Sequence, residues 1–162
     1  MTVDITAEKL PESRRGRMHR IAVVGSGSWG TALAVVAATA GNEVRLWGRD
    51  AGLMDEIATT RRNARNLPDI DIPPNVTATA DIGAAIGDAE AVLVVTPSKT
   101  LREMCRAMAP HLGRDVPVAL CCKGIERGTG LLLSQVRRPN CRIIRSARCP
   151  ARPSPARARS AI

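Results

Sequence analysis

The chain has 162 residues, enough for one domain, and its core must form without Phe or Tyr because Trp29 and Trp47 are its only aromatic side chains. Eight of the 24 Lys and Arg residues, and none of the 15 Asp and Glu residues, lie in 137–162, so the net charge of +9 belongs to one end. A nearly neutral body with so few aromatic side chains argues against nucleic-acid binding, and no apolar run is long enough to cross a membrane.

The first residues are polar and charged, contain Pro11 and show no periodicity, so we expect a disordered leader over 1–19. Met18, just before the first apolar run, is an alternative start of the protein. Arg14-Arg15 followed by an apolar stretch also resembles an export signal. Glycines interrupt that stretch and an α/β pattern continues from it, which favours a cytoplasmic protein.

From residue 20 onward, short apolar runs alternate with helical segments. The runs predict strands over 21–24, 44–47, 76–79, 91–95 and 116–121. Helices are predicted over 29–40, over 50–60 capped by Asp50, in a short stretch opened by Asp81, over 98–109 capped by Ser98, and from 130 to 136. A Pro-rich connection over 66–74 follows the second helix. This alternation indicates βαβ units and a parallel sheet.

The pattern ends after residue 136. Residues 137–162 are rich in Arg, Pro, Ala and Ser and show no apolar period, so we expect a disordered basic tail. The cysteines, at 105, 121, 122, 141 and 149, form no Cys-x-x-Cys pair and no ligand set with His. This spacing predicts plain buried thiols in a reducing compartment, and no metal site.

One glycine-rich segment carries the strongest functional signal. Gly25-Ser26-Gly27-Ser28-Trp29-Gly30 lies between a predicted strand and a predicted helix with the spacing Gly-x-Gly-x-x-Gly. In a dinucleotide site the first glycine permits a tight turn, the second lets the backbone approach a pyrophosphate, and the third lets the helix pack on the strand. The amino end of the helix adds free N–H groups and a positive dipole end. Glycines also mark ordinary turns, but this context predicts that Gly25, Gly27 and Gly30 bind NAD or NADP.

The end of the second predicted strand bears on which cofactor is bound. An NAD site usually places Asp or Glu there to hold the ribose hydroxyls. This chain has Gly48-Arg49-Asp50, in which the planar guanidinium of Arg49 suits a 2′-phosphate and Asp50 keeps NAD possible. The alternative is a solvated Arg49 beside an Asp50 that only caps the next helix. The segment favours NADP without excluding NAD.

Five segments, in order, resemble bacterial-type NAD(P)-dependent glycerol-3-phosphate dehydrogenases. They are 21–34 (IAVVGSGSWGTALA), 46–50 (LWGRD), 66–76 (NLPDIDIPPNV), 96–102 (TPSKTLR) and 123–136 (KGIERGTGLLLSQV). The resemblance implies that Ser28 and Trp29 line the cofactor phosphates and that Arg49 meets the adenosine side. It also implies that Lys123 contacts both the cofactor and the glycerol phosphate.

Three further places in these segments, Lys123, 96–98 and Asn66, bear on the expected site. Lys123 follows the predicted strand 116–121, at the edge where open α/β sheets bind ligands, although an isolated lysine in a turn is most often only solvated. Residues 96–98 would lie beside the nicotinamide. Asn66 departs from the family, which has an aromatic residue before Leu-Pro, so we expect weaker packing of this loop.

The resemblance implies an incomplete Rossmann-type α/β domain over 20–136, a doubly wound parallel sheet whose helical C-terminal substrate domain is absent. The implied activity of the family is reversible hydride transfer between glycerol 3-phosphate and dihydroxyacetone phosphate. No catalytic residue is assigned, because the family's general base lies in the second domain, and we expect an inactive cofactor-binding fragment. The expected partners are small molecules, not nucleic acid or membrane, and the oligomeric state stays open.

The basic tail has two interpretations. Codons chosen for 137–157 and read in a shifted frame spell the family's next segment, Leu-Ser-Gly-Pro-Ser-Phe-Ala, so our hypothesis is that a frameshift created 137–162. The alternative is a non-catalytic nucleotide-binding or basic interaction module, whose tail binds nucleic acid or anionic surfaces.

Overall fold

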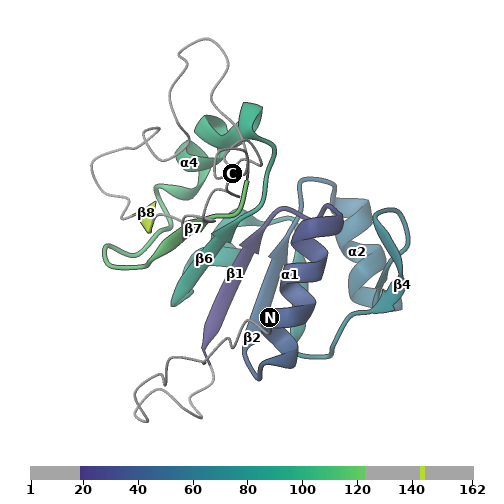
Figure 1. Ribbon diagram of the computed structural model, residues 1–162. Helices are drawn as coiled ribbons and strands as arrows, with labels where there is room; N and C mark the ends of the chain where they lie inside the picture. Colours follow the sequence, from purple (N-terminus) through teal and green to yellow (C-terminus); the bar gives the residue numbers. More distant parts are fainter. Residues whose placement is uncertain (1–18, 123–142, 145–162) are drawn as a thin grey trace, which may run out of the picture.

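The computed structural model describes residues 19–122 and 143–144 (Figure 1). Over this part of the chain a parallel sheet has the strand order β5-β2-β1-β6-β7-β8. Its strands are β1 (Arg20–Val24), β2 (Glu43–Trp47), β5 (Val76–Thr79), β6 (Ala91–Val94), β7 (Val118–Leu120) and β8 (Ile143–Ile144). The order reverses direction between β1 and β6, as in a doubly wound Rossmann sheet. The predicted fold class is therefore confirmed.

Helices cover both faces of the sheet (Figure 1). Because successive side chains of a strand point to opposite faces, Ala22 and Val24 of β1 face one core and Val23 faces the other. The first core is closed by α3 (Ile82–Ile86) and α4 (Leu101–Met108). The second is closed by α1 (Ser28–Thr39) and α2 (Ala51–Thr60). Burial on both faces explains why β1 reads as an unbroken apolar run.

Two predicted helix caps are confirmed. Asp50 Oδ1 accepts a hydrogen bond from the Leu53 N–H at 3.1 Å, at the start of α2. Asp81 Oδ1 accepts from the N–H groups of Gly83 at 2.8 Å and Ala84 at 3.2 Å. Each carboxylate satisfies N–H groups that have no partner within the first helical turn.

The predicted cap at Ser98 is wrong. Residues Ser98–Thr100 form a 3₁₀ turn, η2, and α4 begins only at Leu101. The Thr100 hydroxyl donates to the Pro97 carbonyl at 2.9 Å and makes no cap bond to the helix. This 3₁₀ turn adds three residues between the end of β6 and the start of α4, compared with a helix that begins at Ser98.

The connection over 66–74 contains a strand that the sequence did not predict. The strand β4 (Leu67–Asp71) pairs antiparallel with β3 (Arg62–Asn63) in a separate two-stranded sheet. Pro68 argued against a strand in this segment, because proline cannot donate a backbone hydrogen bond. Proline is nevertheless tolerated where a strand has an unpaired edge.

Structure also extends into the predicted tail, where β8 pairs in parallel with β7 through Val118 and Ile143. The prediction of a tail without any strand is wrong for these two residues. The predicted leader up to residue 18, the predicted helix over 130–136 and the rest of 137–162 lie outside the described residues. The predicted domain boundaries, including the one at 136, stay predictions.

Candidate functional site

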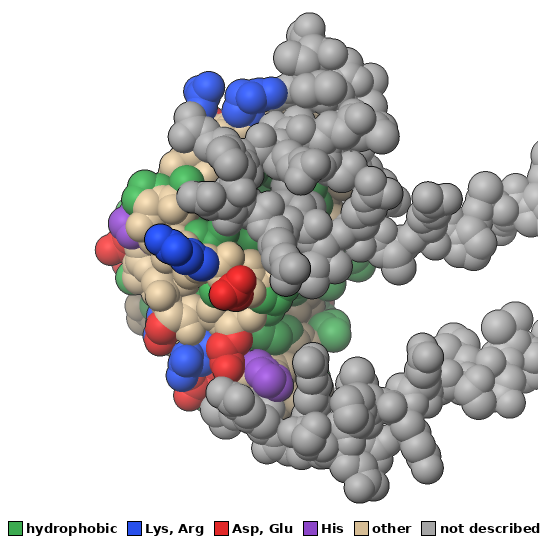
Figure 2. Space-filling model, turned by 90° about the vertical axis from the view of Figure 1, so that its left-hand side faces the viewer, with side chains coloured by type: hydrophobic (Ala, Val, Ile, Leu, Met, Phe, Trp, Pro, Cys, Tyr) green, Lys and Arg blue, Asp and Glu red, His purple; other side chains and the backbone are tan. Residues whose placement is uncertain are grey.

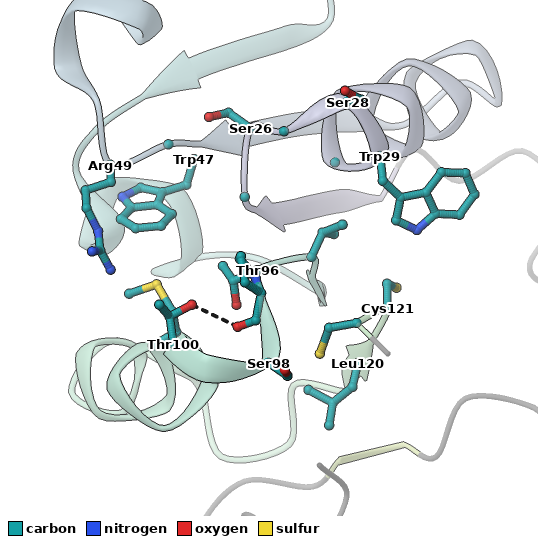
Figure 3. A pocket seen from close by; sticks show the side chains of 18 residues that line it. Ser26, Ser28, Trp29, Trp47, Arg49, Thr96, Ser98, Thr100, Leu120 and Cys121 are labelled. Carbon is teal, nitrogen blue, oxygen red and sulfur yellow. Dashed lines mark hydrogen bonds between the residues drawn. The ribbon is translucent and has the colours of Figure 1, made fainter. Parts of the chain in front are cut away.

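A pocket of about 1160 Å³ opens at the carboxyl ends of the parallel strands (Figure 3). It is lined by residues that directly follow β1, β2, β6 and β7. Val24 of β1 pairs with Trp47 of β2 on one side and with Val94 of β6 on the other, so the pocket lies where the strand order reverses. Open α/β sheets bind ligands at this place.

The three predicted glycines line the pocket, and each meets a different environment. Gly25 has φ +127°, and an added Cβ would lie 2.8 Å from the Val95 carbonyl oxygen. A Cβ on Gly30 would lie 1.8 Å from the Gly25 oxygen, which is closer than atoms can approach. A Cβ on Gly27 would meet nothing within 4 Å. Gly25 and Gly30 are therefore required by the turn itself, whereas Gly27 leaves space beside the backbone.

The amino end of α1 borders that space. Gly27 is its N-cap residue, offers no side-chain cap and is followed by no acidic residue in the first turn. The first N–H groups of any helix lack intrahelical partners and carry the positive end of the helix dipole. This helix end is thus suited to an anion.

The predicted contacts Ser28 and Trp29 also line the pocket. The Ser28 hydroxyl donates to the Asn66 carbonyl at 2.6 Å, so its proton is already engaged. Trp29 is 60% exposed, and Figure 3 shows its ring at the opposite end of the pocket from Arg49.

Arg49 lines the pocket, Asp50 is the next residue in the chain, and both form ion pairs. The guanidinium Nη2 of Arg49 lies 3.2 Å from Oε1 of Glu103 on α4, with both side chains more than half exposed. Asp50, besides capping α2, accepts from Arg65 at 2.7 Å. The hydrogen bonds from Arg65 and from the Leu53 N–H hold the pKa of Asp50 below its ordinary value.

Two residues of the pocket wall have features that the sequence did not reveal, although Thr96 was expected beside the nicotinamide. A Cβ on Gly48 would lie 2.4 Å from the Ser26 hydroxyl and 2.6 Å from Cε of Met54, so the ends of these two flexible side chains would have to move to admit it. The sequence feature that could have pointed to Gly48 is its position directly after the apolar strand β2. Thr96 is 7% exposed, and its hydroxyl finds no hydrogen-bond partner among the described residues. Only the folded structure reveals that orphaned group.

The cysteines partly contradict the prediction of plain buried thiols. None of Cys105, Cys121 and Cys122 forms a disulfide within the described residues, but each is only half buried, and the last two line the pocket. Burial raises the pKa of both pocket thiols, which keeps them protonated near neutral pH. Lys123, the next residue, lies outside the described residues, as do Cys141 and Cys149.

The described residues contain neither a membrane-spanning helix nor a cluster of metal-binding side chains. None of the helices in 19–122 is long and apolar enough to span a membrane. No group of three or more His, Cys, Asp and Glu side chains in that part of the chain is arranged to hold a metal ion.

Comparison with known families gives the decisive observation. The family described as the N-terminus of NAD-dependent glycerol-3-phosphate dehydrogenase matches residues 20–144. The chain belongs to this family. It is 48% identical over 120 residues to the glycerol-3-phosphate dehydrogenase [NAD(P)+] of Xanthomonas euvesicatoria, covering 74% of this chain and 35% of that protein. It is 47% identical over 134 residues to that of Azorhizobium caulinodans, covering 83% and 38%.

Solved structures agree with this assignment. The glycerol-3-phosphate dehydrogenase of Coxiella burnetii superimposes with a TM-score of 0.70 at 36% identity, over 74% of this chain and 36% of that one. That of Plasmodium falciparum shares the fold, with a TM-score of 0.67 at 24% identity, over 76% and 39%. The chain spans little more than a third of the length of these dehydrogenases.

Proposed function

We propose that residues 20–136 bind NAD or NADP as the cofactor domain of an enzyme that interconverts glycerol 3-phosphate and dihydroxyacetone phosphate. The observation that carries the proposal is the open space at Gly27, next to an uncapped helix end and at the reversal point of the sheet. A pyrophosphate needs backbone N–H groups that it can approach closely, and a side chain at this position would block it.

Different pocket residues would contact different parts of the cofactor. Gly25 and Gly30 shape the turn, while Gly27 and the backbone of Ser28 and Trp29 would hold the pyrophosphate. Because the Ser28 hydroxyl donates to Asn66, we assign Ser28 a contact through its backbone N–H.

The adenosine end would lie at Arg49 and Asp50. Asp50 is engaged with the Leu53 N–H and with Arg65, which leaves its carboxylate little capacity for a ribose hydroxyl. Arg49 is the group for a 2′-phosphate, and its partner Glu103 opposes that charge. These opposing features support binding of both NAD and NADP.

The other end of the pocket would hold the nicotinamide, which carries the hydride in this chemistry. The Thr96 hydroxyl is buried and unpaired in the described part of the chain, so an amide group of a ligand would satisfy it. The family resemblance assigns Lys123 to the cofactor and to the substrate phosphate.

We place the protein in the cytoplasm, with small molecules as its ligands. The absence of a disulfide among the described cysteines, 105, 121 and 122, fits a reducing compartment. On the face drawn in Figure 2, basic and acidic side chains are interspersed, which does not favour nucleic acid as a partner of the described body. The alternative basic interaction module depends on 137–162, of which the structure describes only Ile143–Ile144.

Tryptophan fluorescence tests cofactor binding directly. Trp29 and Trp47 both line the pocket, and the chain has no Tyr, so intrinsic emission reports on the site. We expect NADH and NADPH to quench the tryptophan emission until the quenching saturates. Energy transfer from tryptophan should at the same time increase the emission of the bound nucleotide. Quenching that stays linear with ligand concentration would refute the proposal. The substrate is tested in the complete gene product, by oxidation of NADH that depends on dihydroxyacetone phosphate.

A further inference from the structure

A buried asparagine outside the pocket forms hydrogen bonds with the glycine-rich turn. Asn63, at the end of β3, is 0% exposed. Its Nδ2 donates to the Ser26 carbonyl at 2.9 Å and to the Thr31 hydroxyl at 2.8 Å. Its Oδ1 accepts from both the backbone N–H and the side-chain amide of Asn66, each at 3.2 Å.

These partners leave the Asn63 amide only one orientation. A backbone carbonyl can only accept and a backbone N–H can only donate, so the NH₂ group must face Ser26 and the oxygen must face Asn66. The Ser26 carbonyl receives two further donors, Asn66 Nδ2 at 3.2 Å and the Thr31 hydroxyl at 3.4 Å. Asn66, expected from the sequence to weaken packing of its loop, instead ties that loop to the turn.

The orientation of this carbonyl fixes an N–H group. The peptide between Ser26 and Gly27 is planar, and the described chain contains no cis peptide. In a trans peptide the N–H points opposite to the C=O. The Ser26 carbonyl points to Asn63 in the interior, so the Gly27 N–H points away from it. The glycine itself lines the pocket and has open space beside it.

We propose that Asn63 is a positioning residue, which presents the Gly27 N–H to the pyrophosphate of the dinucleotide by holding the Ser26 carbonyl inward. The inference rests on the proposed function. Without Asn63, the Ser26 carbonyl loses its shortest donor and can turn toward water in the pocket. The peptide then directs an oxygen, instead of an N–H, at the phosphates.

Asn75 provides a matched control. Its side-chain amide donates to two backbone carbonyls, those of Ala38 at 2.8 Å and Asn42 at 2.7 Å. It is only partly buried, whereas Asn63 is fully buried, and it lies beside the carboxyl end of α1, away from the pocket. Asn63→Leu removes four side-chain hydrogen bonds and Asn75→Leu removes two, and only Asn63→Leu affects the turn.

The experiment compares the 162-residue protein with Asn63→Leu and Asn75→Leu. Dissociation constants for NADH and ADP come from fluorescence and calorimetric titrations, and unfolding in urea measures stability. We expect Asn63→Leu to lower the affinity for both ligands by about 10- to 150-fold, which corresponds to the loss of one hydrogen bond to a charged group. Asn75→Leu should lose stability but bind as the parent does. The Gly27 amide resonance should shift when inorganic pyrophosphate is added to the parent, and not in Asn63→Leu.

Each result decides the question. Equal affinities in the parent and in folded Asn63→Leu overturn the inference and leave the proposed function standing. Absence of dinucleotide binding by the parent overturns both. If Asn63→Leu does not fold, Asn66→Ala decides, because it removes one donor to the Ser26 carbonyl and keeps Asn63. We expect Asn66→Ala to weaken NADH and ADP by about three- to tenfold, and unchanged affinity would refute the inference.

Discussion

Replacing Gly27 by alanine should separate ligand binding from stability. Gly27 has φ −70° and ψ 178°, a conformation open to any residue, and an added Cβ meets nothing within 4 Å. Alanine is a poorer N-cap than glycine by up to about 1 kcal/mol, but it also lowers the entropy of the unfolded chain by about 0.4–1 kcal/mol. These effects oppose each other, so we expect the free energy of unfolding to stay within about 1 kcal/mol of the parent value.

Binding should respond far more strongly, because the new methyl group fills the space that we assign to the pyrophosphate. Displacing the phosphate from one backbone N–H removes a charge-assisted hydrogen bond worth about 1.5–3 kcal/mol, or about 10- to 150-fold in affinity. Gly30→Ala is the contrast. Its Cβ would lie 1.8 Å from the Gly25 oxygen, so the turn must shift, at a cost of about 3 kcal/mol or more.

The assay pairs two measurements on each variant of the 162-residue chain. NADH titrations followed by tryptophan emission give the dissociation constant, and urea unfolding gives the stability. Gly27→Ala should bind weakly and unfold like the parent, whereas Gly30→Ala should lose both properties. If Gly27→Ala binds NADH as tightly as the parent, the space beside Gly27 is not the pyrophosphate site. If it unfolds as readily as Gly30→Ala, the geometric reasoning about the turn is wrong.

Three other perturbations test the surroundings of the site. Glu103→Gln should raise the affinity for NADPH relative to NADH by about threefold, because it removes the carboxylate that pairs with Arg49. Parallel titrations with NADPH and NADH measure this ratio. Glu43→Gln, at the opposite end of the sheet, is the control. Thr96→Val should leave stability unchanged or raise it by about 1 kcal/mol, since it removes a buried unpaired hydroxyl, but should weaken NADH; a loss of stability in urea would contradict this. The lowered pKa of Asp50 contributes stability that is present above the ordinary carboxyl pKa of about 3.9 and is lost as pH falls through the folded-state value. Asp50→Asn should therefore reduce the loss of stability on acidification below about pH 4, measured by urea unfolding at stepped pH, and an unchanged acid limb would count against it.

The parts of the fold that could be predicted depend on local signals. The strand Val76–Thr79 and the caps at Asp50 and Asp81 follow from side chains within a few residues of each element. The strand β4 could not be predicted, because Pro68 argues against a strand unless the partner strand is known. The prediction at Ser98 failed for a similar reason: a serine can cap a helix, but here the chain first makes a 3₁₀ turn.

The residues of the site also fall into those that local sequence signals predicted and those that they did not. The glycine spacing was readable because each glycine acts within a strand, a turn and a helix that are contiguous in the chain. The place of Thr96 beside the pocket was also expected, but its unpaired hydroxyl was not, because that state depends on all the groups that surround it in the fold. Asn63 was not, because it reaches Ser26 across 37 residues of chain, by way of a two-residue strand.

The contacts of the glycine-rich turn explain how a flexible sequence can form a fixed binding surface. Glycines are conformationally free, so the turn must be held by bonds to the rest of the fold. The Gly25 N–H donates to the Trp47 carbonyl at 2.9 Å, and the Gly27 carbonyl accepts from the Thr31 N–H at 2.9 Å. Together with the bond from Asn63 to Ser26, these contacts engage the polar groups that face the protein. Because the ordering of the turn occurs on folding, a ligand that binds there need not supply it, and more of its interaction energy is expressed as affinity.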